Sequence, residues 1–293
     1  IEDGALAIMM VEAGGTEATW RLYEAGAPKV DEEVIAGGLE AAKQWIAASI
    51  ELQKQLRADV IRERGPIAEI PYEIHRDYDD EVFDTVAEQA TAATSEAMSI
   101  ADKTERNDRL DQILEGLILA MAGTPEEPQQ FATRVKQIKP AFRSLQKKVV
   151  RSRIVNEGLR IDGRGTTDIR DLTAEVEILP TSHGSGLFQR GVTQVLSVCT
   201  LGMPKMDQLL DTLAPENKKR NMHHYNMPPH ANGETGRVGS PKRREIGHGL
   251  LAERALLPVV PSMEKFPYTL RLVSEVLASN GSTSMGSVCA SSL

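Results

Sequence analysis

Three consecutive basic residues at the start of a predicted helix are the first candidates for chemistry. A Ser-Pro pair at 240–241 is typical of a helix N-cap and first turn, because serine accepts an unpaired amide and proline has none to leave unpaired. Lys242, Arg243 and Arg244 follow, and positive charge at the positive end of a helix is unfavourable unless an anion lies nearby. His248 shares a helix face with Arg244. The pattern indicates an anion-binding helix start; a solvated basic turn is the alternative.

A second candidate is the hydroxyl-rich loop 280–284. It follows an alternating run at 270–276, which predicts a half-buried strand, and it precedes small residues compatible with a helix. The strand, the Asn-Gly turn, the hydroxyls of Ser282, Thr283 and Ser284 and the helix start together resemble an anion cradle. An ordinary turn with a serine cap has the same pattern. Two such devices in one domain favour a phosphate site.

Short strands and turns surround these two devices from about residue 153 onward. Residues 172–179 alternate, and residues 187–201 are long enough for two paired strands around Gly191. The Asp-Gly pair at 162–163 indicates a turn. We therefore expect an α+β domain that holds the phosphate site.

The stretch before this domain has helical periodicity throughout. Apolar residues recur every three or four positions over 83–100, 110–121 and 131–149, with Gly123 as a stop signal and Pro140 as an expected kink. Three amphipathic helices predict a small bundle. The bundle contains no chemical motif, and we interpret it as a structural linker.

The N-terminal region predicts one strand and one long helix. The apolar run Ala5 to Val11 is typical of a buried strand, and residues 31–56 carry apolar side chains at helical spacing. A domain seldom starts with a strand only four residues from its first residue, so we expect these elements to be the end of a domain.

Composition limits the classes of function. The chain has 293 residues, of which 41% are hydrophobic. Because its net charge is −8, a polyanion would have to bind at a local basic patch and not through the charge of the whole chain. The first basic group is Lys218, Lys219, Arg220, Arg237, Lys242, Arg243 and Arg244. The second is Lys136, Lys139, Arg143, Lys147, Lys148, Arg151 and Arg153. Two unpaired-looking cysteines and the lack of a long apolar run or signal peptide predict a cytoplasmic protein without a membrane segment.

Several long strings in the second half resemble a known family. They are RIDGR at 160–164, TSHGSGLFQRG at 181–191, HYNMPP at 224–229, GETGRVGSPKRREIGHG at 233–249 and FPYTLRLVSEVLASNGSTSMGSVCAS at 266–291. These strings are similar to the second RNase PH-type domain of bacterial polynucleotide phosphorylases, in the actinobacterial form. Val192, Met227 and residues 230–232 depart from the usual pattern, which affects expected RNA contacts near 227–232.

The resemblance implies a fold and its division into domains. We expect an α+β/α chain in which partial RNase PH-type domains, with ribosomal protein-like βαβ units, flank an all-helical bundle. Residues 1–60 would end the first such domain, residues 61–150 would form the helical linker, and residues 151–293 would begin the second domain with the phosphate site.

The resemblance also implies an activity. Inorganic phosphate would attack the 3′ end of single-stranded RNA and release nucleoside diphosphates, reversibly, in a homotrimeric enzyme. Ser282, Thr283 and Ser284 would hold the phosphate, and Arg243, Arg244 and His248 would contact the phosphate or the scissile backbone. The ligands of the Mg²⁺ or Mn²⁺ cofactor are expected downstream of Leu293, with none in this chain.

Two other functions remain open at this stage. Some actinobacterial relatives are described as guanosine pentaphosphate synthetases, and the sequence does not separate that activity from phosphorolysis. A non-catalytic RNA-binding subunit is the third reading, but such a protein has no need of a pocket for free phosphate. His223, His224 and His230 lack ordered partner ligands and do not predict a metal site.

Overall fold

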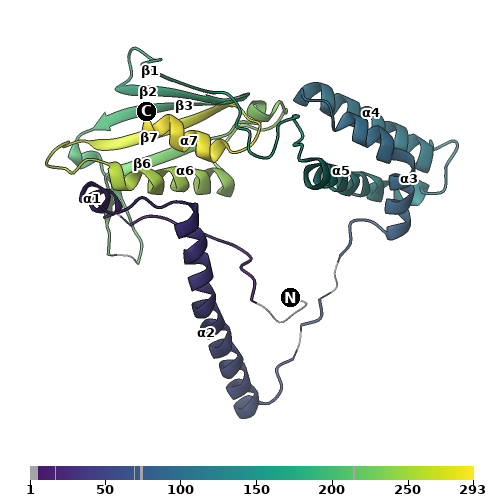
Figure 1. Cartoon of the computed structure of the whole chain (residues 1–293), viewed down its shortest axis with the longest axis horizontal. Coiled ribbons are helices and arrows are strands. Elements are labelled where there is room, and N and C mark those ends of the chain that lie inside the picture. Colours follow the sequence, from purple (N-terminus) through teal and green to yellow (C-terminus); the bar gives the residue numbers. More distant parts are fainter. Residues whose placement is uncertain (1–5, 17, 69, 73–74, 214) are drawn as a thin grey trace. The chain divides into compact units, whose positions relative to one another are not determined.

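The computed structural model describes all residues except 1–5, 17, 69, 73–74 and 214. The chain packs as two units, each with its own core: residues 1–67 together with 170–293, and residues 68–169 (Figure 1). No helix in the described part is long and apolar enough to cross a membrane.

The unit of residues 68–169 is a three-helix bundle, as the periodicity predicts. It contains α3 (Asp80–Ala97), α4 (Lys103–Ala122), the short 3-10 helix η1 (Ala132–Arg134) and α5 (Val135–Glu157). Val86, Leu117 and Phe142, one from each α-helix, are buried in its core. Gly123 ends α4 at a positive φ of 72°, and α5 continues through Pro140.

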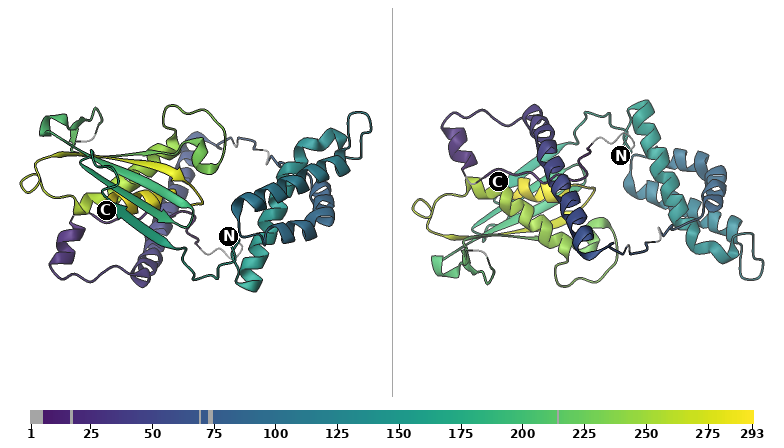
Figure 2. Two further views of the ribbon diagram at one scale, coloured as in Figure 1. Left: turned by 90° about the horizontal axis from the view of Figure 1, so that it is seen from above. Right: turned by 90° about the horizontal axis from the view of Figure 1, so that it is seen from below.

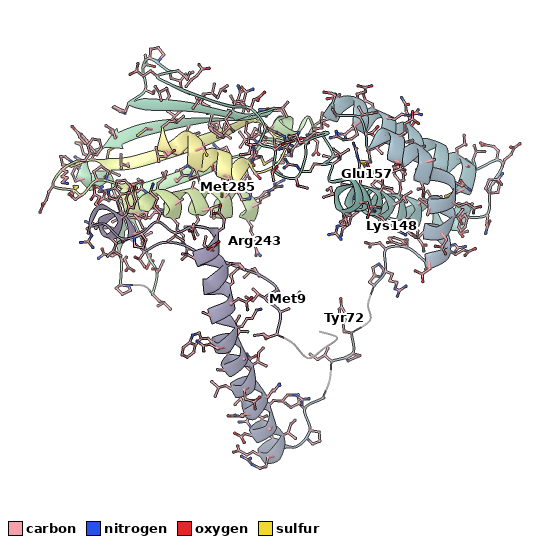
Figure 3. The ribbon with its side chains drawn as sticks, in the orientation of Figure 1. Met9, Tyr72, Lys148, Glu157, Arg243 and Met285 are labelled. Carbon is pink, nitrogen blue, oxygen red and sulfur yellow. The ribbon has the colours of Figure 1, made fainter. Side chains whose placement is uncertain are left out.

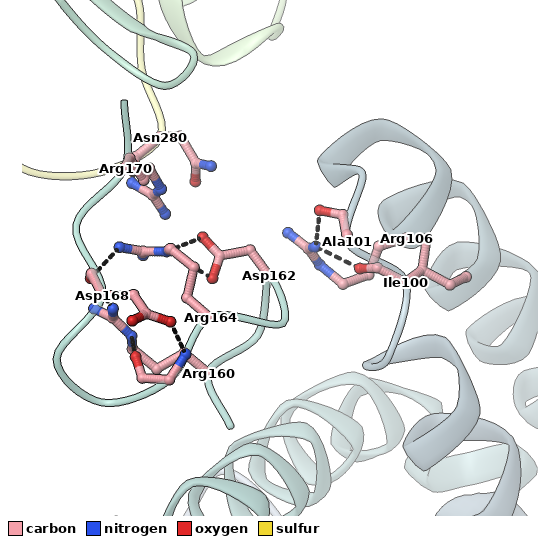
Figure 4. A network of polar contacts seen from close by, with 10 residues as sticks. Ile100, Ala101, Arg106, Arg160, Asp162, Arg164, Asp168, Arg170 and Asn280 are labelled. Atoms are coloured by element: carbon pink, nitrogen blue, oxygen red, sulfur yellow. Dashed lines mark hydrogen bonds and ion pairs between the residues drawn. The ribbon is translucent and has the colours of Figure 1, made fainter. Parts of the chain in front are cut away.

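A compact turn follows the bundle within the same unit. The amide of Arg160 donates to the carbonyl of Arg164, and Gly163 has a φ of 80° (Figure 4). The guanidinium of Arg160 donates to the carbonyl oxygens of Gly165 and Asp168. The Nε of Arg164 lies 2.9 Å from the carboxylate of Asp162. The predicted Asp-Gly turn is confirmed, and both arginines of its motif stabilise the turn.

The main sheet of the other unit has five strands in the order β1-β2-β3-β7-β6. The strands are β1 (Leu172–Val176), β2 (Gly184–Arg190), β3 (Thr193–Gly202), β6 (Asn221–Asn226) and β7 (Thr269–Ala278). All neighbours are antiparallel except β6 and β7, which run parallel. A separate pair joins β4 (Gln208–Leu209) and β5 (Lys218–Lys219). The predicted strands around Gly191 are confirmed.

Two helices pack side by side against this sheet: α6 (Arg243–Leu256) and α7 (Thr283–Ser292) (Figures 1 and 2). Small residues allow the close approach. A Cβ at Gly249 would lie 2.9 Å from the carbonyl oxygen of His223, and one at Gly286 would lie 3.1 Å from Cγ2 of Val195. Short 3-10 helices η2 (Pro204–Met206), η3 (Pro229–Asn232) and η4 (Leu257–Val259) connect the strands and helices.

The N-terminal region contains α1 (Thr19–Glu24) and α2 (Glu32–Arg64). The predicted long helix is confirmed, and Asp31 caps it by accepting from the amide of Val34 at 2.9 Å. The predicted strand at 5–11 is wrong for residues 6–11, which form no regular structure and expose Met9 and Met10; Ala5 lies outside the described residues. A strand needs a neighbour for its amides, and the described part of the chain offers this segment none.

Candidate phosphate site

The basic helix start lies two residues later than the Ser-Pro pair predicts. The N-cap of α6 is Lys242, whose amide donates to the Glu245 carboxylate at 2.8 Å. Arg243 and Arg244 are thus the first two helical residues, and both are exposed. The prediction that Ser240 caps this helix is wrong, because the cap interaction comes from a carboxylate inside the first turn.

Helix α6 is attached to the edge strand β6 through two carboxylates. Glu245 accepts a second hydrogen bond from the amide of Met227, just after β6, at 3.0 Å. Two turns later, Glu253 accepts from the amide of His223 at 3.2 Å and from the ammonium of Lys219 at 3.0 Å. Gly249 lies between them. These contacts fix where the arginines at the helix start lie relative to the end of β6.

The hydroxyl-rich loop joins the end of β7 to the start of α7. Gly281 has a φ of 87°, and Ser282, the N-cap of α7, is held in the left-handed region at φ 51° and ψ 40°. The first helical hydrogen bond runs from the amide of Gly286 to the carbonyl of Ser282, so the amides of residues 283–285 have no acceptor within the helix. A left-handed serine followed by free amides is suited to binding an anion.

Side chains from β2, from β3 and from the segment just before β1 hold the backbone groups of this loop. Arg170 donates to the carbonyl oxygen of Asn280 at 3.0 Å, and Arg190 donates to that of Gly281 at 3.0 Å. The hydroxyl of Thr193 accepts from the amide of Asn280 at 2.9 Å. The loop therefore has a defined conformation before any ligand arrives, which lowers the entropic cost of binding.

The three predicted hydroxyls differ in their surroundings. Ser282 is exposed and Ser284 is half-buried, and neither hydroxyl makes a hydrogen bond within the described part of the chain. Thr283 is buried, with 2% of its surface exposed, and its Oγ1 accepts from the hydroxyl of Tyr225 at 2.6 Å. Two hydroxyls are thus available to a ligand, whereas Thr283 is engaged in positioning the helix start.

Tyr225 brings the two predicted devices together. Its hydroxyl contacts Thr283 at the start of α7, and its ring packs edge-on against the imidazole of His248 on α6, with ring centroids 5.0 Å apart. Arg244 is close enough for its charge to act on both aromatic groups. Figure 3 labels Arg243 at the start of α6 and Met285 on the neighbouring α7.

The electrostatics of the site favour a neutral histidine beside fixed positive charge. Burial, and secondly the charge of Arg244, lower the pKa of His248. Burial raises the pKa of Tyr225, which therefore keeps its proton for Thr283. Nδ1 of His248 is buried and has no hydrogen-bond partner among the described residues. The positive charge available to an anion is therefore that of the arginines.

A buried polar cluster lies between α7 and the sheet. Nε2 of His223 lies 2.9 Å from Oγ of Ser291 and 3.1 Å from Oγ of Ser274, and Oγ of Ser291 lies 2.7 Å from Oγ of Ser197. Burial, and to a smaller extent neighbouring His224, lower the pKa of His223 to about 4. The cluster ties the C-terminal end of α7 to β3, β6 and β7.

The divalent metal implied by the resemblance does not fit the side chains present. Among the described residues, no three His, Cys, Asp or Glu side chains lie close enough to hold a metal ion. Glu245 is occupied by two backbone amides. Glu253 pairs with Lys219, and Glu275 accepts from the side-chain amide of Asn226 at 2.6 Å. No step of the reaction is therefore assigned to a metal held by these residues.

Part of the first basic group has a structural role. Lys219 pairs with Glu253, and Arg220 donates to the carbonyl oxygens of Phe266 and Pro261. The residues that the sequence did not single out for the site are Tyr225, Arg170, Arg190, Thr193 and Glu245. Tyr225, Arg190 and Glu245 lie within the quoted strings, which was the available signal.

Two family models match the chain. Residues 168–293 match the 3′ exoribonuclease family (RNase PH), domain 1, and residues 81–165 match the RNA binding domain of polyribonucleotide nucleotidyltransferase. The sheet with α6 and α7 therefore has the RNase PH-type fold, combined with a helical region, and the predicted fold class is confirmed. The helical segment interpreted above as a linker is the part of the chain that matches the model described as an RNA binding domain.

Curated relatives match over nearly the whole chain. The polyribonucleotide nucleotidyltransferases of Acidothermus cellulolyticus, Mycolicibacterium smegmatis and Saccharopolyspora erythraea are 56%, 58% and 55% identical to it. The matches cover 100%, 98% and 98% of this chain but 36%, 36% and 38% of the relatives, so the chain spans about a third of their length. The chain is therefore similar to one segment of these polyribonucleotide nucleotidyltransferases.

Solved structures show a weaker likeness. An Archaeoglobus fulgidus exosome with RNA bound to the active site matches with a TM-score of 0.38 and 18% identity, over 50% of this chain and 58% of that one. Rice Rrp46 matches with a TM-score of 0.30 and 22% identity, over 45% and 57%. Matches of this size add nothing to the family assignment.

Proposed function

We propose that this chain carries the phosphate-handling segment of a polyribonucleotide nucleotidyltransferase, a phosphorolytic 3′-to-5′ exoribonuclease. The observation that carries the proposal is the convergence of two anion-binding helix starts on Tyr225. That tyrosine contacts Thr283 on one helix and His248 on the other. Free hydroxyls and free amides at one helix start and arginines at the other suit an inorganic phosphate co-substrate.

In this reaction, an oxygen of inorganic phosphate attacks the phosphorus of the last phosphodiester. The bond from that phosphorus to the O3′ of the preceding nucleotide breaks, a nucleoside diphosphate leaves, and the O3′ takes up a proton. The nucleophile is the phosphate itself, so no protein side chain becomes covalently attached. The protein contributes by positioning two anions close together and by offsetting their charge.

Each residue of the site has a proposed role. The hydroxyls of Ser282 and Ser284, with the free amides at the start of α7, bind the attacking phosphate. Arg243 and Arg244 bind phosphate oxygens and offset charge in the transition state, since a guanidinium stays protonated and binds in a bidentate manner. Neutral His248 contacts the phosphate or the scissile backbone. Thr283, fixed by Tyr225, positions the other two hydroxyls.

The partners proposed for the whole protein follow from this reaction. They are the 3′ end of single-stranded RNA, inorganic phosphate and nucleoside diphosphates, in a cytoplasmic homotrimer. A magnesium or manganese ion would require ligands other than the engaged carboxylates of this segment. RNA binding by the helical unit agrees with the family description of residues 81–165.

The decisive experiment replaces the matching segment of the Mycolicibacterium smegmatis relative with this chain. Purified chimera is incubated with RNA and phosphate, and separately with GTP and ATP, and thin-layer chromatography identifies the products. We expect phosphate-dependent release of nucleoside diphosphates, abolished when Ser282 and Ser284 are both alanine. Guanosine pentaphosphate without nucleoside diphosphates would instead favour the synthetase. RNA binding without either product would favour a non-catalytic subunit.

A further inference from the structure

Helix α5 of the helical unit carries a row of positive charge in a stretch of sequence that has no acidic residue. Between Val135 and Asn156 the sequence contains no Asp or Glu. Its Lys and Arg side chains are those of residues 136, 139, 143, 147, 148, 151 and 153. The packed neighbour α3 has the opposite composition, with no Lys or Arg and five acids at 80, 81, 84, 88 and 96.

Five of these cations share one face of the helix. At about 100° per residue, Lys136, Lys139, Arg143, Lys147 and Arg151 fall opposite the side of α5 that enters the core. We call these five residues the α5 basic row. The core side consists of Ile138, Ala141, Phe142 and Leu145. The row extends for about 22 Å, with steps of about 6 Å between most neighbours.

The α5 basic row is free, whereas other cations of this unit are engaged. All five side chains are exposed, and none forms an ion pair or hydrogen bond with the described part of the chain. By contrast, Arg134 pairs with Glu81 at 2.9 Å, and Arg153 donates to the carbonyl oxygen of Met98 at 2.8 Å. Figure 3 labels Lys148, next to the row, whose ammonium lies over the Phe83 ring. Stability of the bundle therefore does not require the row.

The chemistry of the row selects one kind of partner. A protein interface has an apolar centre, and a helix on a membrane surface has an apolar face open to lipid. The apolar face of α5 is already used in the core, with Phe142 and Leu145 each 2% exposed. Regularly spaced cations on a helix whose one aromatic residue, Phe142, is buried, and whose exposed valines, Val135 and Val155, lie at its two ends, match a chain of phosphates. The rings of Phe131 and Phe142 are buried and therefore cannot stack on RNA bases.

We infer that the α5 basic row binds the phosphate backbone of single-stranded RNA, without preference for base sequence. This inference rests on the proposed function only for the identity of the polyanion. It goes further by naming the surface and its mode of recognition. Backbone recognition by cations predicts a steep salt dependence of affinity and the same affinity for different sequences.

The test measures the affinity of the full chain for fluorescent oligo(U) and for a mixed-sequence RNA of equal length, at several salt concentrations and without phosphate. The variant is Lys139→Gln, Arg143→Gln and Lys147→Gln together. With about 0.7 counterions released per neutralised phosphate on single strands, three lost contacts should reduce the slope of log K against log salt by about 2. Circular dichroism checks that the variant is folded.

A matched control removes three exposed cations from α2: Lys54→Gln, Arg57→Gln and Arg62→Gln. It changes the net charge equally and should leave the slope unchanged. An equal fall in the control would overturn the inference, as would a slope that stays constant in the α5 variant. Loss of binding to vesicles of anionic lipid, with RNA binding intact, would assign the row to membranes and overturn it too.

The same assay separates this inference from the proposed function. Replacing Ser282 with glycine alters the candidate phosphate site but should leave the RNA slope unchanged. Suppose that the chimera fails in phosphorolysis, while the α5 variant shows the reduced slope of log K for RNA against log salt. That result would reject the catalytic proposal alone. A chimera active in phosphorolysis with an unaltered slope in the α5 variant would reject the RNA surface alone.

Discussion

Tyr225 shows how one side chain can make a site from two helix starts. It is hydrogen-bonded to Thr283, 58 positions later in the sequence, and its ring packs against His248. Neither helix start alone distinguishes a ligand site from an ordinary cap or a solvated basic turn. Contact through a shared buried tyrosine favours the phosphate interpretation, because it links the helix that carries the arginines to the helix that begins at the hydroxyl-rich loop.

The arginines of α6 should affect catalysis more than stability. Arg244→Gln or Arg243→Gln in the chimera is expected to reduce phosphorolysis by roughly 10²-fold or more, the effect of losing one preorganised donor. Unfolding free energy should change by less than about 0.5 kcal/mol, because both side chains are exposed. The rates come from nucleoside diphosphate release. Arg57→Gln on α2 is the matched control, and unchanged rates in both α6 variants would contradict the site.

Ser282 offers a test that separates phosphate binding from folding. Ser282→Gly removes the hydroxyl but suits the left-handed backbone at φ 51°, so stability should change by less than about 1 kcal/mol. Phosphate affinity should fall about tenfold or more, as expected for a lost hydrogen bond to an anion. Calorimetric titration with phosphate measures it.

The matched control for this substitution is Glu177→Gly, because Glu177 also has a positive φ, of 61°. It should relieve backbone strain without changing phosphate affinity. Equal affinities in the parent chain and in Ser282→Gly would show that the phosphate lies elsewhere.

His223 should make stability depend on pH. Its pKa in the folded chain is about 4, below the ordinary value of 6.5, so the unfolded chain takes up a proton first as the pH falls. Unfolding free energy should therefore decrease between about pH 6.5 and pH 4, and His223→Gln should flatten that decrease. Because the pKa values of His224 and His248 are also lowered, a smaller decrease of the unfolding free energy should remain in His223→Gln. Urea unfolding at pH 7, 5.5 and 4.5 measures the effect.

Exposed His75 supplies the control, since its replacement by glutamine should leave the decrease unchanged. A decrease in His223→Gln as steep as that of the parent chain would show that the proton uptake occurs elsewhere.

At the level of residues, the sequence predicted the groups that a ligand would touch but missed those that hold them. Ser282, Arg243 and Arg244 belong to short local patterns of caps and charges. Arg170 and Arg190 reach the loop from 110 and 91 positions away, so their role depends on strand pairing that no local pattern reveals. The roles of Ser282, Thr283, Ser284, Arg243, Arg244 and His248 stay predictions.

Among the elements, α6 depends on a single carboxylate at its start. Glu245→Gln keeps the size of the side chain but can accept from only one of the two amides, of Lys242 and Met227. We expect a loss of about 1 to 2 kcal/mol of unfolding free energy and faster hydrogen exchange at both amides. Exposed Glu264→Gln is the control. Unchanged exchange at residues 227 and 242 would show that the carboxylate does not anchor the helix.

Most elements could be predicted from periodicity, because the spacing of apolar residues records which face is buried. The helices of the bundle and strands β2, β3 and β7 are confirmed on this basis. The start of α6 was misplaced because Glu245, inside the helix, supplies the cap. The strand expected at 5–11 was wrong for the described residues because strand formation depends on partners elsewhere, which an apolar run does not specify.

At the scale of the whole molecule, we expect the chain alone to bind phosphate but not to catalyse phosphorolysis. The chain spans 36% of its Mycolicibacterium smegmatis relative, and the carboxylates described near the candidate site are engaged. The chain alone should therefore broaden the ³¹P signal of phosphate, yet release no nucleoside diphosphate from RNA with phosphate and magnesium. The chimera is the positive control. Phosphate- and magnesium-dependent release by the chain alone would contradict this.

The attachment of α6 also bears on how separate molecules behave toward one another. β6 is the last strand of the sheet, and such an edge can pair with a strand of another molecule and begin aggregation. The carboxylates of Glu245 and Glu253 occupy amides along that edge, and Gly249 allows the helix backbone to cover it. Helix α6, which carries Arg243 and Arg244 at its start, therefore also shields the β6 edge from pairing with a strand of another molecule. Variants that loosen it should become insoluble at concentrations where the parent chain stays in solution.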